Sequence, residues 1–213
     1  MKALIVYGGW QGHEPGPVSQ IVKKSLEAEG AEVEMSETLE ALLDAEKLAS
    51  KDVIVPIWTM GKITGPQCKG LCGAVKGGVG LAGCHGGMGD AFREACNYQF
   101  MVGGQWVAHP GGIIKYRVHI VDHADPVTAG IEHFDMESEQ YYMHVDPSNH
   151  VLATTAFEHN GCTMPVMWKR AWGAGRVFYT SLGHVAKDFD VPQALETFKR
   201  GILWAAAGKN ACC

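Results

Sequence analysis

The sequence lacks an apolar run long enough to cross a membrane, because charged residues or glycines interrupt every hydrophobic stretch well short of about 20 residues. A secretory leader is missing as well, since the apolar start at residues 1–7 ends at two glycines without a small-residue cleavage site. Long basic runs are absent, and the formal net charge is −5. We therefore expect a soluble, cytoplasmic protein that binds neither nucleic acid nor membrane surfaces.

Signatures of a disulfide framework or a zinc knuckle are also missing. The chain has 7 cysteines, an odd number, and without an export signal we expect reduced thiols. Cys68 and Cys72 lie on a predicted helix, but no paired CxxC motif accompanies them. The terminal Cys212 and Cys213 would be a redox or metal-binding tail or, as we favour, a frayed exposed end. Chemistry must therefore be sought in other residue types.

Strand and helix patterns alternate through the first half of the chain. Short apolar runs predict strands at residues 2–8, 31–35, 52–58 and 79–83. Helical patterns predict helices between them, at residues 18–30, 39–48 and 64–76. Because parallel neighbouring strands need crossover connections of this kind, the first half is predicted to form a parallel sheet with helices on both faces.

From residue 113 onward, mixed apolar and polar segments alternate with turn residues. They predict strands at residues 113–121, 141–145, 151–157, 165–171 and 176–182. A hairpin turn is predicted at 173–175, and the chain closes with a helix between Pro192 and Gly208. We therefore predict one α/β domain over residues 1–213, flavodoxin-like, with a mostly parallel central sheet, helices on both faces and some antiparallel strands in the C-terminal half.

Histidines follow three of the predicted strands. His13 comes after the first strand, His85 directly after the fourth and His184 after the last. Ligands of open parallel sheets bind beyond the carboxyl ends of the strands, so these side chains are candidates for one site. The segment 83–87 also has the flanking glycines of a nucleophile elbow, and His85 occupies the turn position that a nucleophile would take, with Cys84 displaced by one residue.

Five segments resemble the ThuA family, which is named for trehalose utilisation. They are Gly8-Gly9 with His13, Gly83-Cys84-His85-Gly86-Gly87, Val107-Ala108-His109-Pro110-Gly111-Gly112, Glu139-Gln140-Tyr141-Tyr142, and Gly175-Arg176-Val177-Phe178-Tyr179 through Gly183-His184. Together they span nearly the whole chain in order. The resemblance implies a class I glutamine amidotransferase-like fold and a role in bacterial sugar catabolism, on disaccharides or their keto derivatives. His184 is similar to the triad histidine of true amidotransferases, but His85 replaces their cysteine, so glutaminase activity is not expected.

Two kinds of chemistry are open to the candidate catalytic residues, which are His13, His85, His109, Glu139 and His184. Imidazoles titrate near neutral pH and can move a proton at a carbon beside a sugar carbonyl, which suits isomerisation, elimination or hydrolysis of a keto-glycoside. Alternatively, the same five residues hold a divalent metal such as zinc, which polarises the carbonyl. The spacing does not decide between them, because no HxH or HxxxH pair is present.

Candidate substrate-binding residues lie near the same strand ends, and they are Trp10, Trp58, Gln105 and Trp106. Flat aromatic faces with polar neighbours are what a sugar ring stacks on. Residues 103–106 are interpreted as part of a mobile rim loop that closes over substrate. Asp90 and Arg93, together with Gln105, are further candidates for hydrogen bonds to sugar hydroxyls.

Each candidate also has a structural interpretation. His13 could cap the following helix, His109 could fix a loop, and Glu139 could pair with Arg176 or Lys169. Trp58 is expected mainly to pack in the core. His144 shares a segment with Glu139 and is intermediate. The other histidines are expected to be packed or solvated, namely His119, His123, His133, His150 and His159.

Three functional hypotheses follow. The leading one is an enzyme of carbohydrate catabolism that acts by histidine acid/base chemistry, with or without a metal, on a small-molecule carbohydrate. The second is a non-catalytic sugar-binding or interaction protein on an amidotransferase-like fold that lost its nucleophile. The third retains amidohydrolase chemistry through Cys84. The oligomeric state is open, and a homo-oligomer is compatible with all three.

Overall fold

The computed structural model describes residues 1–158 and 160–210 of the chain. His159, Cys212 and Cys213, for which expectations are stated above, lie outside the described residues. Within the described ranges, none of the helices has the combination of length and apolar character that a transmembrane helix needs.

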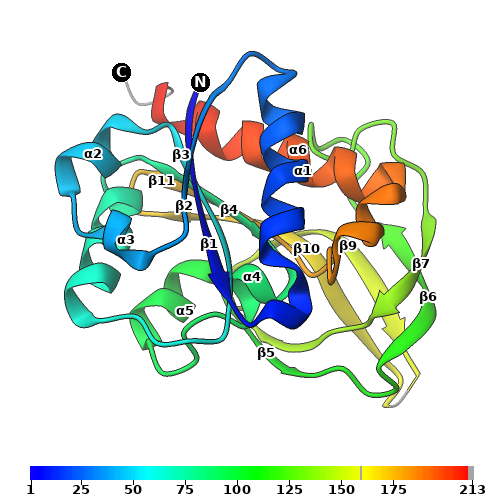
Figure 1. The fold of residues 1–213 in the computed structure, drawn as a ribbon. Coiled ribbons are helices and arrows are strands. Elements are labelled where there is room, and N and C mark those ends of the chain that lie inside the picture. The colour runs from blue at the N-terminus through cyan, green and yellow to red at the C-terminus, as the bar shows by residue number, and fades with distance from the viewer. Residues whose placement is uncertain (159, 211–213) are drawn as a thin grey trace.

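A nine-stranded sheet runs through the molecule (Figure 1). In spatial order, its first five strands are β2, β1, β3, β4 and β11, and they pair in parallel. Their bounds are Glu32–Ser36, Lys2–Gly9, Val53–Thr59, Gly80–Cys84 and Gly175–Thr180. This parallel half is built almost wholly from the first part of the chain, and β11 adds a strand from its end.

Antiparallel strands extend the sheet beyond β11. In spatial order they are β10, β9, β6 and β7, with bounds Cys162–Trp172, His150–Phe157, Ile113–Ile120 and Phe134–Glu139. A separate antiparallel pair is formed by β5 (Gly104–Ala108) and β8 (Tyr142–Val145). The sheet is therefore parallel on one side of β11 and antiparallel on the other.

Helices cover both faces of the sheet because each central strand is buried on both sides. In β1, Ala3 and Ile5 belong to one hydrophobic core, and Leu4 and Val6 belong to the other. Figure 1 shows α1 and α6 on one face and the group of α2, α3 and α5 on the other. The helix bounds are Pro15–Glu27 for α1, Ala45–Ser50 for α2, Gly65–Lys76 for α3, His85–Gly89 for α4, Cys96–Val102 for α5 and Pro192–Ala207 for α6.

The predicted α/β architecture is confirmed in its coarse form. The order β2-β1-β3-β4 matches the start of the flavodoxin-like order, and the hairpin at 173–175 joins β10 to β11 as predicted. The flavodoxin-like description and the words "mostly parallel" apply to one side of the sheet only, since the ladders from β11 to β7 are all antiparallel.

Two local predictions are wrong. The helix predicted at 39–48 is interrupted: a 3-10 helix at Leu39–Leu42 is followed by α2, and the Asp44 side chain caps α2 by accepting from the backbone of Lys47 at 2.9 Å. The rim loop predicted at 103–106 is instead largely the strand β5, held by its ladder to β8. The pairing partner lies far along the chain, so local sequence did not reveal it.

Candidate functional site

The carboxyl ends of the parallel strands bring three of the predicted histidines together. His13 lies in a 3-10 helix, Gln11–His13, directly after β1. His85 follows β4 as the first residue of α4, and His184 follows β11. Glu139 is the last residue of β7 and enters from the antiparallel half. We call these four residues the His–Glu cluster, and they come from four separate segments of the chain.

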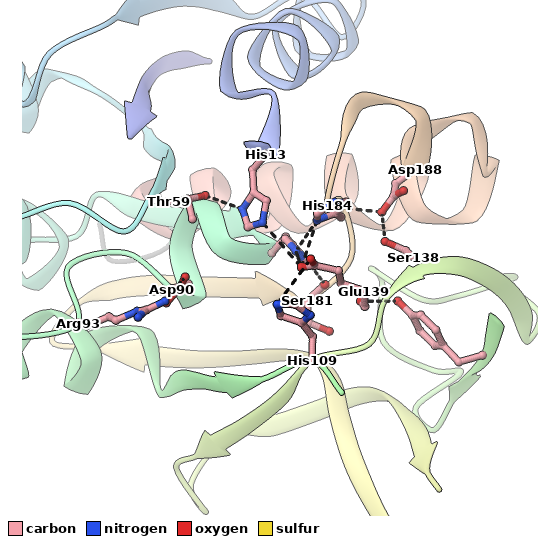
Figure 2. A network of polar contacts seen from close by, with 12 residues as sticks. His13, Thr59, Asp90, Arg93, His109, Ser138, Glu139, Ser181, His184 and Asp188 are labelled. Carbon is pink, nitrogen blue, oxygen red and sulfur yellow. Dashed lines mark hydrogen bonds and ion pairs between the residues drawn. The ribbon is translucent and has the colours of Figure 1, made fainter. Parts of the chain in front are cut away.

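The Glu139 carboxylate is the centre of the cluster (Figure 2). Its Oε2 atom lies 3.1 Å from His85 Nε2, 3.2 Å from His184 Nδ1 and 3.8 Å from His13 Nε2. His184 Nδ1 is 3.4 Å from His85 Nε2. All four side chains are at least largely buried. Three imidazoles and one carboxylate therefore share a small volume that is mostly closed to solvent.

The turn between β4 and α4 sets the position of His85. Its φ of 44° is left-handed, an unusual conformation for a residue with a side chain and one expected at a strand-to-helix elbow. The ring is held on both sides: Nδ1 lies 2.8 Å from the carbonyl oxygen of Ser181, and the Tyr141 ring lies over it with the two centroids 3.8 Å apart. His85 thus projects from the elbow in one fixed orientation.

Close approach of the backbone to His13 requires a glycine at position 86. A Cβ atom there would lie 2.6 Å from Cε1 and Nδ1 of the His13 ring. His13 Nδ1 is also 2.8 Å from the hydroxyl of Thr59, the last residue of β3. The Nδ1 edge is therefore occupied, and Nε2 is the atom that faces Glu139.

Asp188 forms hydrogen bonds to two separate segments of the site. One oxygen, Oδ2, accepts hydrogen bonds from the Ser138 hydroxyl at 2.5 Å and from the backbone N–H of His184 at 2.9 Å. Burial raises the pKa of Asp188, while these two hydrogen bonds oppose the rise. The carboxylate thus links β7, which carries Glu139, to the loop that carries His184.

Burial also controls the charges of the cluster. It lowers the pKa of His85 to about 4, against an opposing hydrogen bond with Glu139. Burial raises the pKa of Glu139, but hydrogen bonds with His13, His184 and His85 outweigh it and leave that pKa well below its usual range. Near neutral pH the centre therefore holds an ionised carboxylate beside a neutral His85.

His109 lies at the edge of the cluster. Its Nε2 atom is 3.6 Å from the other Glu139 oxygen, Oε1, and its side chain is 36% exposed. The Trp106 ring lies beside it, with centroids 5.7 Å apart. On another side, the Trp10 ring packs edge-on against His13 at 4.8 Å and is 48% exposed. His109, Trp10 and Trp106 therefore border the buried centre.

The other predicted binding residues contact neighbours outside the four residues of the His–Glu cluster. Trp58 packs against Gly8, where an added Cβ would lie 2.6 Å from its ring. Gln105 lies opposite His144 in the pairing of β5 and β8. Arg93 forms two hydrogen bonds with the buried Asp90, at 2.5 and 2.9 Å, and its guanidinium lies 4.6 Å from the Trp106 ring centroid. Asp90 and Arg93 therefore support the site wall as a pair.

Two structural interpretations of the candidates are contradicted. Glu139 pairs with histidines, whereas Arg176 donates to the Trp204 carbonyl at 3.2 Å and Lys169 pairs with Asp125. His13 does not cap α1, because Glu14 occupies the cap position and makes no side-chain cap there. The geometry thus ties both His13 and Glu139 to the cluster.

Cys84 is unsuited to nucleophilic attack. Its side chain is 1% exposed and packs in the hydrophobic core with Leu182 and Phe178. Burial, followed by the nearby Asp188, raises the pKa of the thiol to about 12. Because the thiolate is the reactive form, a thiol with this pKa is inert near neutral pH.

Sequence reasoning missed several residues that hold the cluster in place. Thr59 ends β3, so the rule of inspecting strand ends could have identified it. Tyr141 lies two residues after Glu139 in a segment that was already singled out. Asp188 and Ser181 carry no comparable signal, since their partners lie far along the chain or are backbone atoms.

Comparisons with known proteins agree with this architecture. The family model for trehalose utilisation, ThuA, matches residues 2–205. A ThuA-like protein of Parabacteroides merdae has 18% sequence identity and a TM-score of 0.78, covering 98% of this chain and 90% of that one. A ThuA-like protein of Bacteroides uniformis has 17% identity and a TM-score of 0.81, covering 96% and 91%.

A cytoplasmic protein of Salmonella typhimurium LT2 is also similar, with 15% identity, a TM-score of 0.65 and coverage of 99% of each chain. At these identities the likeness to the three structures concerns the fold alone. Among curated proteins, no sequence gives a match.

Proposed function

The chain belongs to the ThuA family of trehalose utilisation, which implies carbohydrate metabolism, and we propose that it is an enzyme acting on a disaccharide or keto-glycoside at the His–Glu cluster. The observation that carries the proposal is the convergence of His85, His184, His13 and Glu139 within hydrogen-bonding or near-contact distance. Burying so many polar groups costs stability, and functional sites are where such costs are retained.

Proton transfer beside a carbonyl is the chemistry that these residues support best. Glu139 is an ionised carboxylate in a largely buried setting, and His109 is close to its Oε1 atom while remaining accessible from solvent. A carboxylate and an imidazole placed in this way can remove a proton from a carbon next to a carbonyl and return it elsewhere. Isomerisation or elimination of a keto-sugar has this form.

The surroundings are compatible with a sugar ring. Trp10 and Trp106 provide aromatic faces next to His13 and His109. A cavity of about 520 Å³ is lined in part by Pro110, Gly111, Tyr116, Gln140 and Thr155, of which Pro110 and Gln140 are the sequence neighbours of His109 and Glu139, while the cluster side chains themselves are not among its lining residues. This volume lies in the range of small-molecule sites. We propose a small-molecule carbohydrate as partner and the cytoplasm as compartment, which is also the compartment named for the Salmonella protein.

The test is turnover by the full chain against a panel of disaccharides and their keto derivatives, followed by NMR of the products. We expect His85→Asn and His184→Asn, each of which removes a contact that holds the Glu139 carboxylate, to lower kcat/KM for the active substrate by at least about 100-fold. His123→Asn is the matched control, because His123 is exposed on the loop after β6. Circular dichroism checks that all three variants are folded.

Two results would contradict the proposal. Full turnover in both cluster variants would show that the reaction, if any, takes place elsewhere. Sugar binding by the unaltered chain without turnover, retained in the variants, would instead support a non-catalytic sugar-binding protein.

A further inference from the structure

We infer that the His–Glu cluster is a binding site for one divalent transition-metal ion, with His13 Nε2, His85 Nε2, His184 Nδ1 and the Glu139 carboxylate as ligands. The four potential ligand atoms lie within 4.8 Å of one another. The inference deepens the proposed function. It rests on that function only where it gives the ion a role in catalysis. Binding itself follows from the geometry of the four side chains.

The separations between the atoms match those around a bound ion. Two ligands at 2.0–2.1 Å from a tetrahedral zinc ion lie about 3.3 Å apart. Glu139 Oε2 is 3.1 Å from His85 Nε2 and 3.2 Å from His184 Nδ1, and the two nitrogens are 3.4 Å apart. His13 Nε2 is somewhat farther from Glu139 Oε2, at 3.8 Å. Three of the groups thus already have the spacing of ligands that share one centre.

The hydrogen bond of His85 to the backbone fixes which ring nitrogen faces Glu139. A carbonyl oxygen can only accept, so His85 Nδ1 must donate its hydrogen to Ser181 at 2.8 Å. The Nε2 atom is then the ring nitrogen that faces the Glu139 carboxylate, at 3.1 Å. In the metal-bound form, both atoms would present lone pairs to the ion. A metal ion satisfies the lone pairs of both groups at once.

The outer partners orient the rings as metal sites require. Histidine ligands commonly use their second nitrogen in a hydrogen bond to a backbone carbonyl or another fixed group, which sets the tautomer and the direction of the ligand nitrogen. His85 has Ser181 in this role, and His13 has the Thr59 hydroxyl at 2.8 Å. Neither ring can rotate without losing its partner.

The donor set indicates the class of ion. Imidazole nitrogens suit zinc and the neighbouring transition metals, whereas calcium and magnesium prefer sites made of oxygen atoms. His109 lies on the Oε1 side of Glu139 at 3.6 Å and is not needed as a ligand. It would remain available to transfer protons beside an ion that polarises a sugar carbonyl.

A second group of potential ligands in the described residues serves as a contrast. Asp122, Asp125 and His150 also lie close together. Both carboxylates already have protein partners, since Asp125 pairs with the buried Lys169 and Asp122 lies 2.8 Å from His150 Nε2. This group has one imidazole, and its carboxylates have protein partners, so it does not require an ion.

The experiment measures metal binding without reference to turnover. The full chain is treated with a chelator, dialysed and titrated with zinc chloride, and separately with manganese chloride, by isothermal calorimetry. We expect one ion per chain for at least one of the metals, with affinity at least about 10-fold weaker in His85→Asn and in Glu139→Gln. His109→Asn and His123→Asn should keep the stoichiometry and bind within about 3-fold of the unaltered chain. X-ray absorption of the loaded protein should show nitrogen and oxygen ligands that include imidazole.

The inference is overturned if neither zinc nor manganese binds at one ion per chain. Unchanged binding in folded His85→Asn and Glu139→Gln proteins would also overturn it. His13→Asn provides a further ligand variant if one of these two fails to fold. One bound ion without turnover of any sugar would leave the metal site standing and remove the proposed function. Turnover by a chain that binds neither metal would support the proposed function and overturn the metal site.

Discussion

At the scale of single residues, the histidine at the elbow sets the chemistry that the site can support. His85 takes the projecting turn position with a φ of 44°, while Cys84 points into the core. The site gains an imidazole that is fixed by Ser181 and Tyr141. The neighbouring Cys84 is buried and does not present the accessible thiolate that a cysteine-dependent amide hydrolysis would need.

Cys84 should therefore resist alkylation in the native protein. With a thiol pKa of about 12 and 1% exposure, it is protonated and inaccessible at pH 8. The exposed Cys96 is the internal reference. After treatment with iodoacetamide, peptide mass spectrometry should find Cys96 labelled and Cys84 unlabelled, and both labelled in urea. Labelling of native Cys84 at the rate of Cys96 would restore the amidohydrolase hypothesis.

At the scale of elements, the short connections after β1 and β4 place the backbone at the start of α4 against the His13 side chain. The α4 helix begins at His85, and its second residue, Gly86, lies against the His13 ring that follows β1. The approach is possible because a glycine has no Cβ atom. Element packing, as much as side-chain identity, thus sets the distance between the two histidines.

Replacing Gly86 with alanine should damage both the fold and the site. The new Cβ would lie 2.6 Å from the His13 ring and 3.0 Å from Thr59 Cγ2. We expect a loss of about 1–3 kcal/mol in the free energy of unfolding, as for other overpacked positions, and weaker metal binding. Urea denaturation measures the first effect and calorimetry the second.

Gly73→Ala is the control for that substitution. Gly73 lies in α3, is exposed, and has open space around the position of an added Cβ. Alanine there should be neutral or stabilise by up to about 1 kcal/mol, because it favours helix. Equal losses from both substitutions would show that crowding at His13 is not the cause.

Most elements, and part of the site, could be predicted from the sequence because their signals are local. Strand ends identified His13, His85 and His184, since each lies in the short segment that follows an apolar run. β7 was missed because its buried positions alternate with exposed acidic residues and one of them is the polar Ser138. Glu139, at the end of this strand, was found only through the family resemblance, because nothing local indicates that β7 reaches the histidines.

At the scale of the whole molecule, one sheet joins a parallel and an antiparallel half. The parallel half supplies His13, His85 and His184, and the antiparallel half supplies Glu139. Lys169, on β10, reinforces the junction. It pairs with Asp125 in the segment after β6, and its ammonium lies 4.3 Å from the Trp204 ring centroid on α6.

Breaking this ion pair from one side should destabilise the whole domain. Both side chains are buried, so Asp125→Ala leaves an uncompensated Lys169 charge and should cost about 3–5 kcal/mol. Adding Lys169→Met should recover part of the loss, since the double variant buries no charge there. Lys115→Ala, at an exposed pair with Glu137, should change stability by less than about 1 kcal/mol. Urea unfolding of the four proteins provides the comparison, and a double variant less stable than Asp125→Ala alone would refute this account.

The contact between His85 and His184 joins positions that are 99 residues apart in the sequence. During synthesis, all three histidines and the glutamate coexist only after the last strand and the loop behind it have left the ribosome. A nascent or truncated chain that ends before residue 184 therefore lacks one of the four residues of the His–Glu cluster.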